Sequence, residues 1–231
     1  MLPVRPAPPV PIVIETEDGT SAYLISRQAY PPPPPPPVTP LNDTFTDSAV
    51  ALDSHTSDSS HTWFGVATSV GGMALTGSGT VYGQEPPLAQ TIYASSFTPS
   101  SADYTVSVTY KVFNFAGDFG AFGRFSGTTP TTFSGYGFRF SAGGGGIQLY
   151  KAIAGSYTQL GSTVTATPVD GDVLSLTMAS NVLTVKKNGS TVLTVTDSSS
   201  PILTAGGVAI WASDGGGGTT AGLHATQIQT S

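Results

Sequence analysis

A run of seven prolines near the start of the chain constrains its fold more than any other feature. The run consists of Pro31, Pro32, Pro33, Pro34, Pro35, Pro36 and Pro37. Proline fixes φ and carries no backbone N–H, so these residues form neither a helix nor a central strand. In the polyproline II conformation they would span roughly 22 Å, and we expect them to act as a stiff spacer.

Proline also divides the chain into two parts. Thirteen of the 19 prolines lie in residues 1–40, a proline-rich arm, and residues 41–231 form the body. The body is rich in Thr, Ser, Gly, Val and aromatic residues, and Glu85 is its single glutamate. Because helix formers are scarce and strand formers common, the body is predicted to be an all-β domain with a substantial core.

Charge and composition exclude several classes of function. The formal net charge is −6 and there is no cysteine. Binding to nucleic acid is mostly phosphate neutralisation, so we expect no direct contact with DNA or RNA. The lack of cysteine fits folding in a reducing cytosol and excludes disulfides. Prolines interrupt the N-terminus before an apolar segment develops, and no stretch reaches ~20 apolar residues, so we expect neither a classical secretory signal nor a membrane span.

The arm has one segment with strand character, residues 11–26. Two apolar runs, 12–14 and 22–25, flank Asp18-Gly19, a pair that suits a tight hairpin turn. An isolated two-stranded hairpin is marginal in water, so we expect this one to add to a sheet edge of another protein. The residues expected to anchor it are Ile12, Val13, Ile14, Tyr23, Leu24 and Ile25. A disordered tail or linker is the alternative for such a composition.

Strand patterns follow one another through the body. The clearest is residues 103–115, where Tyr104, Val106, Val108, Tyr110 and Val112 share one face. Further strands are predicted within 120–126, 135–142, 146–153, 172–197, 206–213 and 222–230, with a hairpin turn at Asn188-Gly189. Roughly a dozen strands with no helix favour two packed antiparallel sheets.

The order of several motifs resembles a known family. "NDTFTDSAVALDSHTSDSSHTW" is similar to a family start in which Asp-x-Phe leads to an early Trp, and "SADYTVSVTY" is similar to the strand that follows. Arg124, Tyr136 and Leu149-Tyr150-Lys151 hold recognisable places in the next hairpins, and "GGVAIWAS" resembles a late strand. Residues 41–231, without the arm, therefore resemble the concanavalin A-like lectin/glucanase superfamily, which has a laminin-G-type jelly-roll sandwich.

The resemblance carries expectations about function. Such domains occur in phage virion and tail proteins, lectins and secreted enzymes, so the fold does not decide between them. An arm before a jelly roll resembles phage structural proteins that display a sandwich outward. We therefore expect a non-enzymatic virion protein, assembled in the host cytoplasm and oligomeric, whose residues 1–30 bind a capsid or tail protein. The alternatives are a tail-fibre or receptor-binding module that adheres to host-surface glycans, and a secreted glycan-processing enzyme.

Carboxylates suited to catalysis are hard to find. Glucanases of this fold use paired carboxylates on one strand, and retaining hydrolysis requires them about 5–5.5 Å apart. Glu85 precedes Pro86-Pro87 in a predicted turn, and Asp170 and Asp172 flank Gly171, where Asp favours turns. We therefore predict no catalytic residue.

The histidines are weak candidates for a triad or a metal site. His55 and His61 lie in a loop with Asp53 and Asp58, while His224 belongs to the last strand. The loop offers N and O ligands, yet Ser- and Asp-rich loops are usually solvated turns, and no nucleophile elbow accompanies the histidines. Asp118 and Asp214 lie in Gly-rich loops without ligand spacing for calcium. We predict no metal and no cofactor.

A glycan site needs aromatic rings beside polar groups. Trp211 alternates with Val208, Ile210 and Ala212, which predicts that it lies on the less buried face of its sheet. A similar alternation applies to Arg124, Arg139 and Tyr150, and these four residues are the candidate glycan-binding set. The alternative is that Trp211 belongs to the core and the arginines pair with carboxylates.

Overall fold

The computed structural model describes residues 12–15, 21–24, 38–67, 72–84, 90–213 and 221–231. The chain forms two compact units, Met1–Pro37 and Val38–Ser231. The larger unit begins close to the boundary expected after residue 40, and Leu41 is already fully buried in its core.

The smaller unit contains an antiparallel hairpin. Strand β1 (Ile12–Glu15) pairs with β2 (Ser21–Leu24), with Ile12 opposite Leu24 and Val13 opposite Tyr23. The predicted strand pair therefore forms where the apolar runs lie. Its expected turn at Asp18-Gly19, the anchor residue Ile25 and the spacer Pro31–Pro37 lie outside the described residues.

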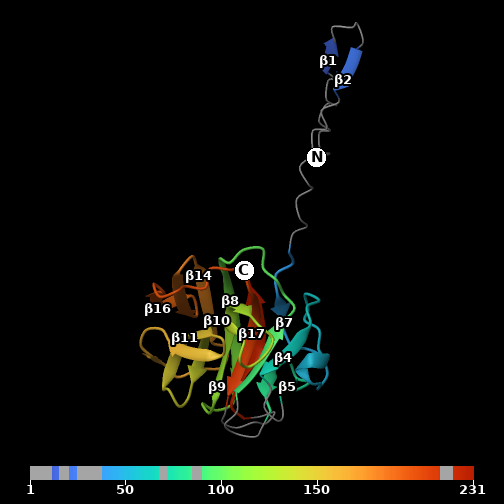
Figure 1. The fold of residues 1–231 in the computed structure, drawn as a ribbon. Coiled ribbons are helices and arrows are strands. Elements are labelled where there is room, and N and C mark those ends of the chain that lie inside the picture. The colour runs from blue at the N-terminus through green and yellow to red at the C-terminus, as the bar shows by residue number, and fades with distance from the viewer. Residues whose placement is uncertain (1–11, 16–20, 25–37, 68–71, 85–89, 214–220) are drawn as a thin grey trace. The chain divides into compact units, whose positions relative to one another are not determined.

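The larger unit is a sandwich of two antiparallel sheets (Figure 1). Sheet I consists of β4 (Trp63–Ala67), β7 (Gln90–Ser95), β9 (Asp118–Ser126), β10 (Ser134–Ser141), β11 (Gly146–Ile153), β12 (Ser156–Gln159), β13 (Val164–Thr165) and β17 (Gly207–Ser213). Its strand order is β12-β11-β10-β9-β17-β7-β4, with β13 beside β11.

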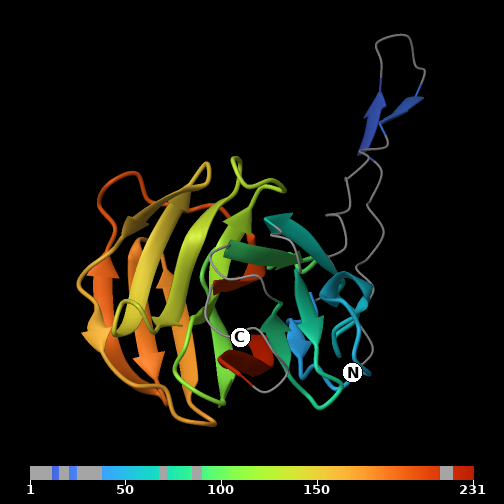
Figure 2. The same ribbon diagram turned by 90° about the horizontal axis from the view of Figure 1, so that it is seen from below.

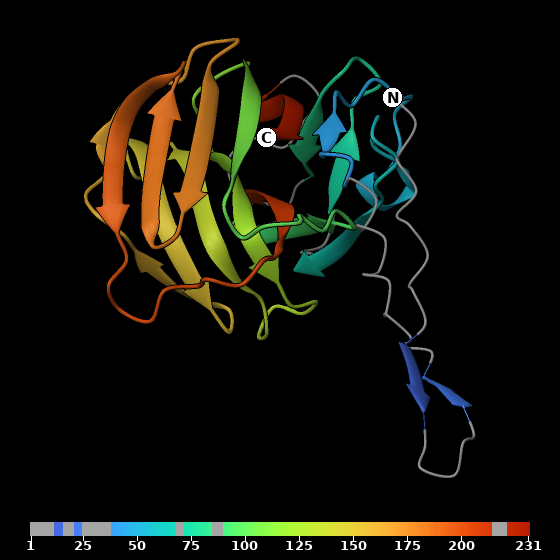
Figure 3. The same cartoon turned by 90° about the horizontal axis from the view of Figure 1, so that it is seen from above.

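Sheet II consists of β3 (Asn42–Asp43), β5 (Met73–Leu75), β6 (Val81–Gly83), β8 (Tyr104–Val112), β14 (Val173–Ala179), β15 (Val182–Lys187), β16 (Ser190–Thr196) and β18 (Leu223–Thr230). Its order is β16-β15-β14-β8-β18-β6-β5, with β3 beside β18. Figures 2 and 3 view the sandwich from opposite ends, and in both the orange strands β14–β16 face the yellow and green strands β9–β11.

The core lies between the two sheets, as the alternation in the sequence predicts. On β8, Val106, Val108 and Tyr110 are fully buried, while Tyr104 and Val112 are half-buried against the same core. Tyr110 also donates a hydrogen bond from its hydroxyl to the Phe119 carbonyl at 2.9 Å across the sandwich. The prediction of an all-β, two-sheet antiparallel sandwich is confirmed.

Some elements differ from the expectation. The larger unit has more strands than predicted, because β3, β5, β6, β7, β12 and β13 were not anticipated as separate strands, whereas β4 begins at Trp63, the early Trp of the family resemblance. The expected Asn188-Gly189 turn joins β15 to β16, with φ of 51° and 79° at its two residues. The described residues contain one helical turn, η1 (Leu52–Ser54), and no helix among them is long and apolar enough to cross a membrane.

The first strand of the larger unit is held by the last. In β3, Asn42 lies opposite Gln229 of β18 and Asp43 lies opposite Ile228. Just before β3, the Leu41 amide donates to the Thr230 hydroxyl and the Thr230 amide donates to the Leu41 carbonyl, each at 2.9 Å. The segment that follows the arm is therefore fixed to a strand inside Sheet II.

A buried ion pair beside the core predicts how stability depends on pH. Lys151 Nζ lies 2.9 Å from Asp197 Oδ2, which also accepts a hydrogen bond from the Tyr136 hydroxyl at 2.7 Å. Burial raises the pKa of Asp197, but the hydrogen bonds from Lys151, Tyr136 and the Ser199 amide outweigh it and leave that pKa below its usual value.

Because the pKa of Asp197 is lowered in the folded protein, its contribution to stability is present above its unfolded pKa, near 3.9, and is lost as the pH falls through the folded pKa. The destabilisation caused by Asp197→Asn should therefore be largest at neutral pH and shrink below about pH 4. Urea unfolding of both proteins between pH 7 and pH 2 measures this difference. A destabilisation that stays constant over this range would contradict the assignment.

Candidate functional site

Sheet I carries apolar residues on both of its faces. On β17, Val208, Ile210 and Ala212 face the core between the sheets, whereas Ala209 and Trp211 face away from Sheet II. The buried residues of this second face, here called the outer cluster, are Val66, Ile92, Ala94, Phe122, Phe125, Phe133, Ala152, Ala209 and Trp211. Tyr150 and Tyr157 are half-buried against them.

The register of three strands brings Arg139 to Trp211. Both residues lie opposite Gly120, Arg139 from β10 and Trp211 from β17. A Cβ atom on Gly120 would lie 2.7 Å from the Arg139 Cβ, so the missing side chain makes this close approach possible. The guanidinium carbon of Arg139 consequently lies 4.2 Å from the ring centre of Trp211 and 5.0 Å from that of Tyr150, distances typical of cation–π contacts.

Each nitrogen of the Arg139 guanidinium has a partner. Its NH1 group contacts Asp118 Oδ2 at 2.6 Å, Nε donates to Gln148 Oε1 at 3.1 Å, and NH2 donates to the Tyr150 hydroxyl at 3.2 Å. Tyr150 in turn donates to Gln148 Oε1 at 2.9 Å. The side chains of Arg139 and Asp118 are 13% and 15% exposed, so the positive charge is compensated within a largely buried pair.

Tyr157 of β12 completes the layer above Trp211. The two rings are stacked at 5.3 Å and 24°, and Tyr150 meets Trp211 edge-on at 5.8 Å. Burial raises the pKa of Tyr157 well above its ordinary value, so its hydroxyl stays protonated. Among the described residues, the buried Tyr157 hydroxyl and Trp211 Nε1 have no hydrogen-bond partner. Buried polar atoms are normally paired, so these two are unusual.

Three of the four predicted glycan-binding residues meet here: Arg139, Tyr150 and Trp211. Trp211 lies on the expected face, but it is only 1% exposed because Arg139, Tyr150 and Tyr157 pack around it, so its expected exposure is corrected. Tyr157 and Gln148 were not predicted from the sequence, and neither was a role for Asp118 in a glycan site. The pairing of Ala152 with Tyr157 depends on a short edge strand that carries little sequence signal.

Arg124 lies elsewhere, and a β-bulge explains why. The register between β9 and β10 passes from Ser126 opposite Ser134 to Gly123 opposite Tyr136, so β9 contains an extra residue, and Arg124 has a φ of 48°. The bulge shifts the alternation and turns Arg124 away from the outer cluster. Its side chain is fully buried and donates to the carbonyls of Ala102, Ser180 and Ile202.

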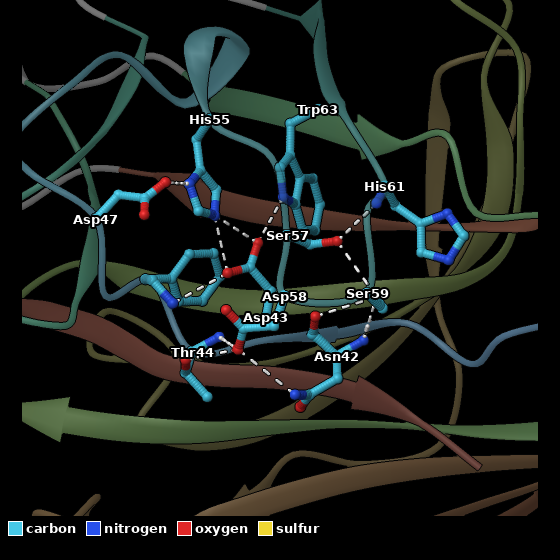
Figure 4. A network of polar contacts seen from close by, with 11 residues as sticks. Asn42, Asp43, Thr44, Asp47, His55, Ser57, Asp58, Ser59, His61 and Trp63 are labelled. Atoms are coloured by element: carbon cyan, nitrogen blue, oxygen red, sulfur yellow. Dashed lines mark hydrogen bonds and ion pairs between the residues drawn. The ribbon is translucent and has the colours of Figure 1, made fainter.

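The histidine loop forms a buried network (Figure 4). Asp43 accepts hydrogen bonds from Trp63 Nε1 at 2.7 Å, from the Phe45 amide at 2.9 Å and from His55 Nε2 at 2.9 Å. The other ring nitrogen of His55 lies 2.8 Å from Asp47 Oδ2. Burial raises the pKa of Asp43, and these hydrogen bonds offset part of the rise. His55 is 2% exposed, so the expectation of a solvated turn is wrong at this residue.

The candidate metal ligands of this loop do not converge. Asp58 accepts hydrogen bonds from Thr44, and His61 Nε2 contacts the Thr39 carbonyl at 3.2 Å. Asp53 is exposed at η1. No group of three or more His, Asp or Glu residues in the described part of the chain is arranged to hold a metal ion.

The remaining candidates have separate local contacts. His224 lies 3.1 Å from the Thr80 hydroxyl and stacks on Tyr82 in Sheet II. Asp170 pairs with Lys111 at 2.7 Å, and Asp172 pairs with Lys187 at 2.9 Å. Glu85 and Asp214 lie outside the described residues.

No family model matches the sequence. No curated protein matches it either. Several solved structures match this chain in fold. A β-glucanase of Bacillus licheniformis matches with a TM-score of 0.54 at 12% identity, over 83% of this chain and 97% of that chain. A glycosyl hydrolase family protein of Mycobacterium fortuitum matches with a TM-score of 0.51 at 13% identity, over 82% and 98%. The potassium-bound carbohydrate recognition domain of Emp46p matches with a TM-score of 0.51 at 10% identity, over 73% and 87%.

The fold is concanavalin A-like. Carbohydrate recognition domains and glucanases share the concanavalin A-like fold, as these neighbours illustrate. Identities of this size show the fold alone, and the function has to be argued from the residues of this chain.

Proposed function

We propose that this chain is a non-enzymatic, lectin-like protein that binds carbohydrate through the outer cluster of Sheet I. The observation that carries the proposal is the chemistry of that face. Asp118 is the single carboxylate in the described strands of Sheet I, and it is paired with Arg139 at 2.6 Å.

A lone paired carboxylate is poorly suited to glycoside hydrolysis. Retaining and inverting enzymes both need two carboxyl groups across the glycosidic bond, and one of them must hold a proton at the start of the reaction. Asp118 has no second carboxylate on neighbouring strands of Sheet I, and its Oδ2 is already engaged by the guanidinium of Arg139 at 2.6 Å. These features support binding without turnover.

Aromatic rings and polar groups gather where binding is proposed. Tyr150 and Tyr157 are half-buried rather than fully enclosed, and the side-chain amide of Gln148 contacts the Tyr150 hydroxyl at 2.9 Å. Aromatic side chains offer an apolar surface with a polar edge, a combination that suits sugars. The similarity of the fold to a carbohydrate recognition domain agrees with this assignment.

We extend the proposal to the arm: the chain is a phage virion protein, anchored by residues 1–30 to a capsid or tail protein in an oligomeric assembly. Two observations support it. The arm and the sandwich are separate compact units, and the arm forms a β-hairpin whose strands pair only with each other among the described residues. Such a hairpin can add to a partner's sheet edge. Adhesion to host-surface glycans, as in a tail-fibre or receptor-binding module, is the second candidate, and the outer cluster favours it.

The test combines binding with turnover. The full chain is incubated with a panel of β-glucans and other polysaccharides, and released reducing ends and retained protein are both measured. We expect retention on at least one polysaccharide and no product above buffer. Turnover that disappears in Asp118→Asn or Glu85→Gln would overturn the non-enzymatic assignment. For the anchoring part, particles assembled with a chain lacking residues 1–37 should contain no sandwich, and normal incorporation would contradict it.

A further inference from the structure

We infer that the outer cluster selects neutral, hydroxyl-rich saccharides and discriminates against acidic ones such as uronates, sialosides and sulfated sugars. The inference rests on the proposed carbohydrate binding and names the class of ligand. The charge and hydrogen bonding of Arg139 carry it.

The positive charge of Arg139 is compensated by Asp118. Arg139 is the cation that packs on Trp211 of the outer cluster, and its NH1 group lies 2.6 Å from Asp118. An acidic sugar brought to this pair would meet a net charge near zero and would approach Asp118 as a like charge. Removing a carboxylate from water is expensive unless a cation or several strong donors replace the lost hydration. The net charge of −6 adds a long-range repulsion for anions.

The hydrogen-bonding groups of Arg139 are already occupied. Arginine recognises carboxylates and sulfates best through two parallel N–H bonds from its planar fork. Here its three nitrogens already contact Asp118, Gln148 and Tyr150. The guanidinium plane is also packed against Trp211, with 4.2 Å from its carbon to the ring centre. An acidic ligand would have to break these contacts before gaining its own.

Two buried polar atoms in this region lack a hydrogen-bond partner among the described residues. Trp211 Nε1 is a donor and the Tyr157 hydroxyl is both donor and acceptor, and neither has a partner among the described residues. A sugar hydroxyl can accept from the indole N–H, and it can donate to or accept from the phenol hydroxyl, so neutral hydroxyl groups suit both atoms. Both atoms are buried, so a ligand would have to displace part of the half-buried Tyr150 or Tyr157 side chain to reach them.

The experiment uses the full chain and matched pairs of oligosaccharides that differ only in an acidic substituent, with affinities measured by calorimetry. The native chain is expected to bind the neutral member at least tenfold more tightly. Asp118→Asn removes the compensating charge in nearly the same shape, so it should raise the affinity for the acidic member about tenfold. Tyr157→Phe should weaken binding of the neutral member about tenfold, since one hydrogen bond is lost. Tyr82→Phe on Sheet II is the matched control and should leave both affinities unchanged.

A second measurement on the native chain covers the case in which Asp118→Asn does not fold. Binding of the neutral sugar should be insensitive to ionic strength, since no uncompensated charge takes part. Native protein that prefers the acidic member, with binding that falls as salt rises, overturns the inference and leaves carbohydrate binding intact. Native protein that binds no sugar of either class overturns the inference together with the proposed function.

Discussion

Replacing Arg124 by methionine is expected to lower the free energy of unfolding by about 3–5 kcal/mol. Its side chain is fully buried and contacts Asp103 at 3.0 Å. It also donates to the carbonyls of Ala102 and Ser180 at 2.7 Å each. Methionine fills much of the volume but donates nothing, so these carbonyls and Asp103 would lose a charged hydrogen-bond donor.

Thermal and urea unfolding of Arg124→Met measure this loss, which corresponds to a decrease in melting temperature on the order of 10 °C. Lys186→Met is a matched control, because Lys186 is a half-buried cation on β15. The control is expected to stay within about 0.5 kcal/mol of the native protein. Equal destabilisation by the two substitutions would show that the buried contacts of Arg124 contribute little.

The second large effect is expected at Asp43. Asp43→Ala should destabilise the sandwich by about 3–5 kcal/mol, because it leaves buried donors from His55, Trp63 and Phe45 without an acceptor. Asp47 offers an unusually close control. It contacts the other nitrogen of the same imidazole at 2.8 Å, but its side chain is 58% exposed.

Asp47→Ala should therefore cost no more than about 1 kcal/mol, as is usual for exposed ion pairs. Urea unfolding at pH 7 of the two variants and the native protein measures both values. If Asp47→Ala destabilised the protein as much as Asp43→Ala, the loss of stability would come from losing the contact with the imidazole and not from the burial of the carboxylate.

Sequence patterns predict the strands whose pairing is local. Residues 104–112 alternate strictly, and the hairpin at Asn188-Gly189 is fixed by its turn residues, so β8, β15 and β16 follow from short stretches of sequence. Strand β7 differs. It pairs with β4 and with β17, which lies far along the chain, and no turn or alternation in residues 90–95 specifies that partner.

The candidate site shows a similar limit. Alternation correctly places Trp211 on the face away from Sheet II, but the residues that cover it come from β10, β11 and β12. Alternation places Arg124 on the same face of Sheet I as Arg139 only if β9 is a regular strand. The extra residue in β9 breaks the alternation, so the Arg124 side chain lies away from that face. Likewise, His55 lies in a Ser- and Asp-rich loop that predicts exposure, and neither its burial nor its contact with Asp43, twelve residues earlier, follows from the local sequence.

The pairing of β3 with β18 determines how the sandwich responds to a pulling force applied at its N-terminal end. If residues 1–37 are held by a particle and the sandwich is pulled by a surface, the tension enters at Val38 and passes directly into β3. A pull along β3 loads its hydrogen bonds to β18 together, in shear, and Leu41 and Thr230 share that load through two more bonds. The buried contacts of Asp43 with His55 and Trp63 resist withdrawal of the same strand. Rupture under tension should therefore begin where β3 pairs with β18, and loss of the Asp43 contacts should lower the force at which it begins.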